Sequence, residues 1–442
     1  MNTHHRLTRE LWIVLFAVII CVPLGAWALQ APFKQASTSW YMAMLLLGQV
    51  SGIVGAQLFS ITLILSARLK SLEFLFGGLD RMYTIHHRTG VIAFSLLALH
   101  PLFLAFRYIP DSLEDVMLFL LPEVADIGKN FGILSLLGML GLLTLTFYGV
   151  RFSYPVLKCA HRFLGLAFFF GLLHMFFIPG VISSNRVIFI SCISVASVGV
   201  IAFIYRTLLG KFLVPRFLYT VTKVQSLAQG VTEISLSPAG KAMSHIPGQF
   251  AILSLVNAKG VSQEEHPFTI SSSYKNGDIR FSVKSLGDYT SLLSSVAPGV
   301  EAKVEGPFGE FSYIYGSSSQ VWVAGGIGVT PFVSMAEDLL TRPVLDMTIH
   351  FFYSVRTRSD AVYEELFTAL ATKHPRFVFY LMPSDVSGFV TGQGILDAVP
   401  QAATADFFVC GPPPMMSALI GQLVDLHIPR EAIHAERFAL LR

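Results

Sequence analysis

The stretch HHRTGVIAFSLLALHPLFLAF, residues 86–106, decides the class of fold. From residue 89 onward it carries no charged side chain. A helix crosses the hydrocarbon core of a bilayer with about 20 apolar residues. Backbone groups in lipid must also find their hydrogen-bond partners within the segment. The stretch therefore predicts a membrane-spanning helix that carries a histidine within it and another close to its start.

Five other runs have the same character. Uncharged runs cover residues 11–29, 42–67, 131–150, 163–185 and 187–205. The first is too long and lies too far from the N-terminus for the apolar region of a signal peptide. We therefore predict six transmembrane helices.

The composition agrees with a membrane protein. Hydrophobic residues make up 53% of the 442 residues, charged residues only 13%, and the mean hydropathy is +0.62. Soluble domains carry about a quarter charged residues, so a uniformly soluble or disordered chain is excluded. A net charge of +3 gives no reason to expect nucleic acid as a partner. The four cysteines show no CxxC spacing and predict neither a disulfide framework nor a zinc site.

Basic residues in the loops set the expected orientation. With a cytoplasmic N-terminus, basic residues near the span ends lie mainly inside, as the positive-inside rule requires. The inside set is Arg6, Arg9, Arg68, Lys70, Arg81, Arg88, Arg151, Lys158, Arg162 and Arg206, and the outside set is Lys34, Arg107, Lys129 and Arg186. Six spans then place the C-terminal half in the cytoplasm as well, and the outer loop around 107–130 is acidic.

Four histidines lie in or at the ends of the third and fifth spans: His86 and His100 on one, His161 and His174 on the other. Both spans run from inside to outside, so each helix contributes one histidine at each of two depths. At about 1.5 Å per residue the two levels are ~20 Å apart. Polar groups in lipid are costly and usually functional, and imidazole is an axial ligand of haem iron. The pattern predicts two stacked haems, each held by two histidines.

The two spacings differ by one residue, so the fifth span needs a local bulge, a bend or a different ring orientation. His87 is a rival of His86. His86 precedes Gly90 by four residues, as His161 precedes Gly165, and this favours His86. We expect these glycines, with Gly171, to let a flat macrocycle approach the backbone.

After Arg206 the texture changes to that of a soluble protein. Alternating runs such as 250–256, 279–283 and 300–304 predict strands between Gly, Pro and Asn turns. From residue 321 the order strand, Gly-rich turn, helix, strand predicts a nucleotide-binding βαβ unit.

Two motifs in the first soluble part suggest a flavin. The first is His266, Pro267, Phe268 and Thr269, followed by Ser271; an aromatic ring with neighbouring hydroxyls can pack on an isoalloxazine and bond its edge.

The second motif contains Lys284, Gly287 and Thr290. A glycine that opens a helix beside a lysine and a hydroxyl predicts a pyrophosphate site.

The strongest soluble motif is VWVAGGIGVTP, residues 321–331. An apolar strand leads into Gly325, Gly326 and Gly328, and Thr330 and Pro331 then open a helix. We expect the glycines to admit a cofactor pyrophosphate to the backbone amides.

Further candidates follow this motif in the chain. Ser354 and Arg356 come after the next strand, and the arginine is either a ligand of an adenosine 2′-phosphate or a solvated loop charge. Cys410, Gly411 and Pro412 follow a later strand, at the edge where open α/β sheets bind ligands.

Cys410 is a candidate catalytic residue or simply a small buried side chain. Phe438 is a candidate flavin-stacking residue or a plain core aromatic.

Taken together, these motifs and their order resemble the bacterial members of the NADPH oxidase and ferric reductase superfamily over nearly the whole length. The resemblance implies an all-α six-helix haem-binding transmembrane bundle over residues 1–210. It further implies a β-barrel FAD-binding domain over 211–315 and an α/β Rossmann-like NAD(P)-binding domain over 316–442. It carries the haem ligands onto the four histidines above, and places the chain in the inner membrane of a bacterial cell.

The implied activity moves electrons from cytosolic NADPH, with NADH possible, through FAD and two b-type haems to an acceptor on the outer face. The acceptor is oxygen giving superoxide, a ferric or cupric chelate, or a periplasmic redox partner. Animal NADPH oxidases carry an Arg in the second span and a His one turn past the outer ligand. Here the second span has Gln49 and Gln57, and Leu104 stands one turn past His100, which weakens the assignment to oxygen.

Overall fold

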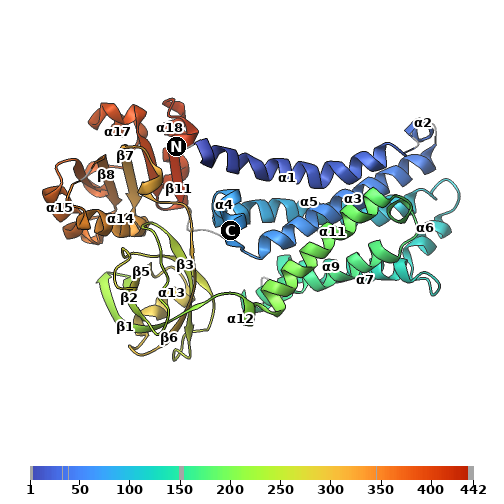
Figure 1. The fold of residues 1–442 in the computed structure, drawn as a ribbon, viewed down its shortest axis with the longest axis horizontal. Coiled ribbons are helices and arrows are strands. Elements are labelled where there is room, and N and C mark those ends of the chain that lie inside the picture. The colour runs from blue at the N-terminus through green and yellow to red at the C-terminus, as the bar shows by residue number, and fades with distance from the viewer. Residues whose placement is uncertain (1–2, 32, 38, 149–153, 345, 437–442) are drawn as a thin grey trace. The chain divides into compact units, whose positions relative to one another are not determined.

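A computed structural model describes residues 3–31, 33–37, 39–148, 154–344 and 346–436. The chain forms two compact units, one of residues 6–214 and one built mainly of residues 215–442 (Figure 1). The change of unit falls at 214/215, a few residues past the boundary expected at 210/211. Each unit is described by itself below.

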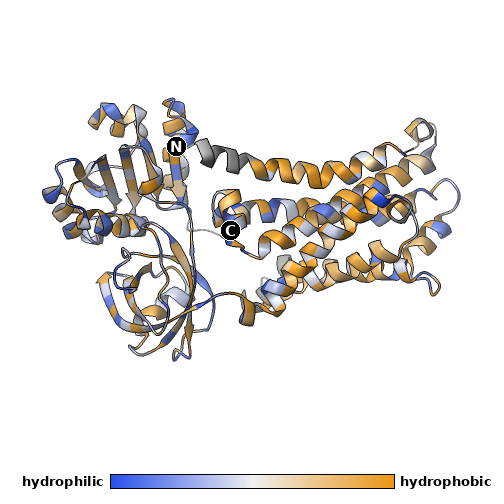
Figure 2. Ribbon diagram, in the orientation of Figure 1, coloured by the Kyte–Doolittle hydropathy of each residue, from blue (hydrophilic) through white to orange (hydrophobic). Residues whose placement is uncertain are grey.

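Six helical segments in the first unit are long and apolar enough to cross a membrane. The predicted six-span bundle is thus confirmed, and Figure 2 shows how apolar these helices are. The long helices are α1 (Thr3–Ala28), α3 (Trp40–Ser66), α5 (Leu79–Phe106), α7 (Ile127–Tyr148), α8 (Tyr154–Arg162) with α9 (Leu164–Phe177), and α11 (Arg186–Phe203), which continues as a π-helix over Ile204–Leu208. Short helices are α2 (Phe33–Ala36), α4 (Lys70–Phe76), α6 (Leu113–Leu120), α10 (Val181–Ser184) and α12 (Gly210–Leu213).

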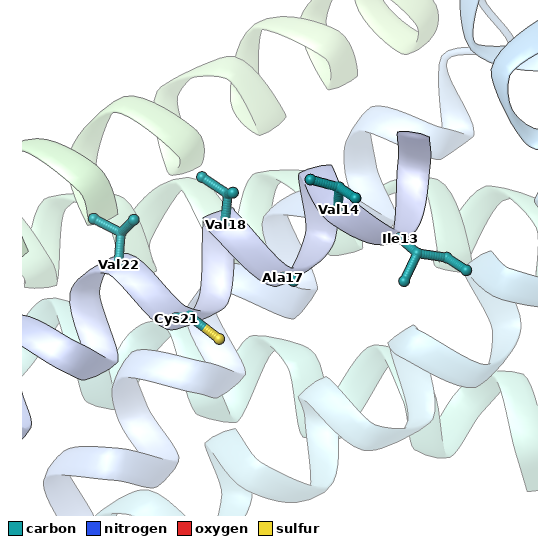
Figure 3. A pocket seen from close by; sticks show the side chains of 6 residues that line it. All are labelled: Ile13, Val14, Ala17, Val18, Cys21 and Val22. Carbon is teal, nitrogen blue, oxygen red and sulfur yellow. The ribbon is translucent and has the colours of Figure 1, made fainter. Parts of the chain in front are cut away.

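Helix α3 is the best-buried span and packs against both α5 and α11, while α7 packs against α9. Helix α1 is the least buried of the spans. A shallow apolar pocket on α1 is lined only by its own side chains, as Figure 3 shows: Ile13, Val14, Ala17, Val18, Cys21 and Val22. This composition suits contact with lipid tails.

The fifth span is broken at one residue. Helix α8 ends at Arg162, Phe163 forms a turn, and α9 begins at Leu164. The break lies between His161 and His174. It supplies the local distortion that their 13-residue spacing requires, whereas α5 runs unbroken between His86 and His100.

The soluble unit begins with a six-stranded antiparallel sheet of order β4-β3-β6-β1-β2-β5. An isolated bridge between Ile270 and Phe281 links the β4 end of the sheet to β5, so the sheet closes into the predicted barrel. The strands are β1 (Phe217–Ala228), β2 (Val231–Pro238), β3 (Phe250–Val256), β4 (His266–Thr269), β5 (Ile279–Lys284) and β6 (Glu301–Phe308), and the short helix α13 (Asp288–Leu292) follows β5. We refer to this part as the FAD lobe.

The remaining lobe is a five-stranded parallel sheet of order β11-β10-β7-β8-β9. Its strands are β7 (Ser319–Gly325), β8 (Thr348–Val355), β9 (Phe377–Pro383), β10 (Asp406–Cys410) and β11 (Ile433–Glu436). The main helices are α14 (Thr330–Thr341), α15 (Glu364–Lys373), α17 (Gly392–Ala398) and α18 (Pro413–Asp425), with a short α16 (Ser384–Ser387) after β9. The strand order reverses between β7 and β10, and ligands of open α/β sheets bind at such a switch point. We refer to this part as the NAD lobe.

Candidate functional site

The four histidines of the membrane unit form two facing pairs. The ring centroids of His86 and His161 are 6.1 Å apart, and those of His100 and His174 are 6.2 Å apart. The ring planes cross at 67° and 71°, respectively. The helices thus bring together the residues that the depth argument paired.

These separations fit one metal ion between the two rings of each pair. A metal–imidazole bond is about 2 Å long, and roughly 1 Å separates the bonding nitrogen from its ring centre. Two imidazoles on opposite sides of one iron therefore have centroids about 6 Å apart.

Hydrogen bonds fix the tautomer of three of the four rings. The Nδ1 atoms of His86, His100 and His174 lie 2.9, 2.7 and 2.8 Å from the backbone oxygens of Thr62, Gly48 and Gly128, respectively. A carbonyl oxygen only accepts, so each Nδ1 carries the proton and donates. The lone pair is then on Nε2, which is the state that a metal ligand requires. The residues present therefore fit haem.

The structure also distinguishes His86 from its neighbour. His86 is half-buried and faces His161, whereas the side chain of His87 is exposed. Of the two, His86 is the one placed to act as a ligand.

The glycines expected to admit a macrocycle serve helix packing instead. A β-carbon at Gly165 would lie 2.2 Å from the Phe203 ring, and one at Gly171 would lie 3.1 Å from Ser135 Oγ. A β-carbon at Gly90 would meet only the Thr62 methyl group, at 3.5 Å. The expectation for these three glycines is corrected: their free space is taken by neighbouring helices.

The glycines that touch the histidine rings are Gly52 and Gly132, which the sequence reasoning missed. Each ends a GxxxG motif, GQVSG (48–52) on α3 and GKNFG (128–132) on α7. This motif marks close helix contacts in membranes and was the signal available.

In the FAD lobe, the predicted flavin residues of β4 form an aromatic group with α13. The His266 ring stacks on Tyr289 with centroids 3.8 Å apart, and Phe268 lies 6.2 Å from His266. Pro267 beside them is exposed. This group offers an aromatic surface at the strand end.

Two buried hydroxyls near this surface have no hydrogen-bond partner within the described part of the chain, those of Thr269 and Tyr289. Burial raises the pKa of Tyr289 to about 12, so its hydroxyl keeps its proton. Buried polar atoms are normally paired, so these two fit a bound polar ligand such as a flavin edge.

Ser271 has a different environment from the one expected. Its hydroxyl is fully buried and lies 2.9 Å from Ser282 Oγ, which lies 2.5 Å from the hydroxyl of Tyr363 in the NAD lobe. Ser271 is thus engaged in the contact between the lobes.

That contact is a polar network with one arginine at its centre. Arg280 of β5 pairs with Glu233 of β2 at 3.5 Å and with Glu337 of α14. Tyr363 donates to Glu233, and Glu337 also accepts from the backbone N–H of Ser273 at 3.0 Å. The network ties the FAD lobe to the NAD lobe.

The second flavin motif is a loop held by its own hydroxyl. Thr290 Oγ1 accepts from the backbone N–H groups of Leu286 and Gly287, at 2.9 and 3.1 Å. Lys284, at the end of β5, is exposed. The loop lies directly before α13, which carries Tyr289 of the aromatic group.

At the switch point, two glycines of the β7 loop pack against the β10 loop. A β-carbon at Gly325 would lie 2.5 Å from Met415 Sδ, and one at Gly328 would lie 2.4 Å from the Cys410 oxygen. A β-carbon at Gly411 would lie 3.1 Å from the Gly325 backbone. These glycines therefore join the two loops, which corrects the expectation that all of them admit a pyrophosphate.

Gly326 is the glycine of this motif that faces open space. It has a φ of 53°, which favours glycine, and a β-carbon there would meet nothing within 4 Å. Thr330 donates to the Ile327 oxygen, and Pro331 stands in the first turn of α14. The turn at Gly326 is thus the accessible part of the motif.

Cys410 ends β10 and is fully buried, beside the loop residues Gly411 and Pro412. Burial, with the nearby Glu436 carboxylate, raises the pKa of the Cys410 thiol well above its ordinary value. The thiol is therefore neutral and unsuited to act as a nucleophile. Glu436 was missed by the sequence reasoning, and Phe438 lies outside the described residues.

Ser354 and Arg356 lie at the carboxyl end of β8, the neighbour of β7. Arg356 is largely exposed and has Asp360 as a partner at 3.6 Å. An arginine after the second strand of such a domain can accept an adenosine 2′-phosphate.

Replacing Arg356 with glutamine is expected to raise KM for NADPH about 10-fold or more and leave KM for NADH unchanged, since a hydrogen bond to a charged group contributes about 1.5–3 kcal/mol. Steady-state rates with both nucleotides measure the ratio. Arg358→Gln is the control, because Arg358 is also largely exposed but pairs with Glu364 at 2.6 Å. Equal shifts with NADPH and NADH would contradict the assignment.

Three family models match consecutive parts of the chain. "Ferric reductase like transmembrane component" matches residues 51–172, "FAD-binding domain" matches 216–312, and "Oxidoreductase NAD-binding domain" matches 322–420. The matches follow the order of the bundle, the barrel and the parallel sheet.

Curated relatives match the soluble part. The chain is 32% identical over 164 residues to one of the proteins that make up the Na(+)-translocating NADH-quinone reductase of Pseudomonas aeruginosa, covering 34% of this chain and 40% of that protein. It is 32% identical over 170 residues to NADH-cytochrome b5 reductase 2 of Mycosarcoma maydis, covering 35% and 49%. The chain thus spans less than half of the length of these relatives.

Among solved structures, the flavohemoglobin of Malassezia yamatoensis has a TM-score of 0.50 at 17% identity, covering 89% of this chain and 98% of that one. The FAD/NAD-binding domain of a nitric oxide dioxygenase from Vibrio cholerae has a TM-score of 0.41 at 20% identity, covering 50% and 97%. At such identities the likeness concerns the fold alone.

Proposed function

Because this chain belongs to the ferric reductase and NADPH oxidase superfamily, we propose that it carries electrons across a membrane, from cytosolic NADPH to an acceptor on the outer face. Its class is that of a membrane flavin-dependent NAD(P)H oxidoreductase of the ferric reductase type. FAD and two b-type haems are the proposed carriers. The inner membrane of a bacterium, with both termini in the cytoplasm, is the proposed location.

One observation supports this function above all others: two histidine pairs with centroid separations of 6.1 and 6.2 Å. The two histidines on α5 are 14 residues apart, so the two pairs are separated by about 20 Å along the helix. Two iron sites at these depths form a path along the bundle.

The soluble residues have distinct tasks in this proposal. The Gly326 turn and Arg356 bind the nucleotide, and the aromatic surface around Phe268 binds the flavin, with Thr269 and Tyr289 as its hydrogen-bonding groups. When bound, FAD takes a hydride from the nucleotide and releases electrons singly, and haem iron passes one electron at a time.

We propose oxygen as the acceptor, with superoxide as the product. A ferric or cupric chelate is the second candidate, and particular side chains favour it. Gln49 accepts a hydrogen bond from Trp27 at 2.9 Å, and Leu104 packs over Gly48. Both positions at which animal NADPH oxidases hold a group near oxygen are thus engaged in helix packing.

The decisive experiment uses purified full-length protein in liposomes, loaded with FAD and haem, with NADPH added outside. NADPH oxidation is compared with and without oxygen and with ferric chelate on either side of the membrane. Superoxide formation that is unaffected by chelate supports the oxidase. Reduction of trapped chelate without oxygen supports the metalloreductase, and activity only after a periplasmic protein is added supports a donor role. Wild-type protein without two haems would contradict the proposal as a whole.

A further inference from the structure

The outer histidines lie in two matching seats, each made by a GxxxG motif. Gly48 and Gly52 of α3 face His100, and Gly128 and Gly132 of α7 face His174. In each seat the first glycine accepts a hydrogen bond from the histidine, at 2.7 and 2.8 Å.

The second glycine of each seat lies against the ring. A β-carbon at Gly52 would be 2.7 Å from Nδ1 and 2.8 Å from Cε1 of His100. A β-carbon at Gly132 would be 2.7 and 3.0 Å from the same atoms of His174. Carbon atoms do not approach a ring this closely, so only glycine admits the imidazole in its present place.

The match extends one turn further along each helix pair. A β-carbon at Gly48 would lie 2.5 Å from Leu104 Cδ2, and one at Gly128 would lie 2.9 Å from the Ile178 nitrogen. Leu104 and Ile178 each stand four residues after the histidine of their helix. The α3–α5 and α7–α9 contacts are therefore built alike, although the sequence has no fixed repeat.

The inner level has a different environment. His86 donates to the oxygen of Thr62, a β-branched residue, and Gly90 meets only the methyl group of that threonine. The glycine seat is thus seen for both rings of the outer pair and not for His86.

We propose that Gly52 and Gly132 are positioning residues for the outer haem. The first glycine of each seat fixes the tautomer, and the second fixes the ring plane by contact. Together they aim both Nε2 atoms at one iron. This inference rests on the proposed binding of haem by these histidines.

The test is Gly132→Ala in the full-length protein, with Gly141→Ala as the control on the same helix, because a β-carbon at Gly141 would meet nothing within 4 Å. We expect Gly132→Ala to lower the haem content from two per chain towards one, or to shift one of two haem transitions in a potentiometric titration. Gly141→Ala is expected to keep both haems and both transitions. Gly52→Ala repeats the test from the other helix.

The outcomes separate the two ideas. Wild-type protein that binds no haem contradicts the proposed function itself. Two unchanged haem transitions in both Gly52→Ala and Gly132→Ala overturn only the positioning role.

If Gly132→Ala assembles poorly, its effect on the thermal midpoint is measured in a His174→Ala background. The effect should vanish there, because the ring that the new methyl group meets is gone. An equal loss in both backgrounds would overturn the inference.

Discussion

Replacing His86 with alanine is expected to leave one haem per chain and to lower reduction of the outer acceptor at least about 100-fold, since even the outer-sphere partners of metal ligands are worth 10–100-fold. The reduction of FAD by NADPH takes place in the soluble unit and should be unchanged. Haem content comes from the pyridine haemochrome spectrum, and flavin reduction from the loss of its absorbance in a stopped-flow instrument.

His87→Ala is the matched control, because its exposed side chain neighbours His86 but does not face His161. It should retain both haems and full activity. A His87→Ala protein that loses a haem while His86→Ala keeps both would exchange the roles of the two residues.

Replacing Arg280 with methionine is expected to destabilise the soluble unit by about 3 kcal/mol. The change leaves the Glu233 carboxylate, only 3% exposed, without its cation, and breaking a buried pair costs about 3–5 kcal/mol. The lower end applies because Arg280 and Glu337 are each about a quarter exposed. Since the same arginine joins the two lobes, the midpoint of thermal FAD release, followed by flavin fluorescence, should fall.

Arg342→Met provides the comparison. Arg342 pairs with Asp338 at 3.2 Å and is nearly half exposed, and such surface pairs contribute about 0–1 kcal/mol. If both variants released FAD at the same temperature, the network would not hold the lobes as described.

The sequence predicted the features that depend on period and depth. Six apolar runs predicted six spans, and the alternation of strand and helix after residue 321 predicted the parallel sheet. The pairing of His86 with His161 followed from counting residues along two helices of the same direction. Each of these inferences needs only one helix or strand at a time.

The assignments that required knowledge of neighbours were less accurate. Gly165 and Gly328 both read as space for a cofactor, but Phe203 and the Cys410 oxygen take that space. Ser271 read as a flavin ligand, but it faces Ser282 within the core. A glycine or serine has too few atoms to reveal its partner in sequence, so its role depends on which element packs against it.

The turn at Phe163 has an evolutionary consequence. Because α8 and α9 are separate helices, the 13 residues between His161 and His174 match a 14-residue step on an unbroken helix. Homologous chains should therefore tolerate gain or loss of one residue at this turn while keeping both ligands in register. The same length change within α5 would rotate His100 away from its partner. Alignments of distant members should accordingly place their gaps in the fifth span and leave the third intact.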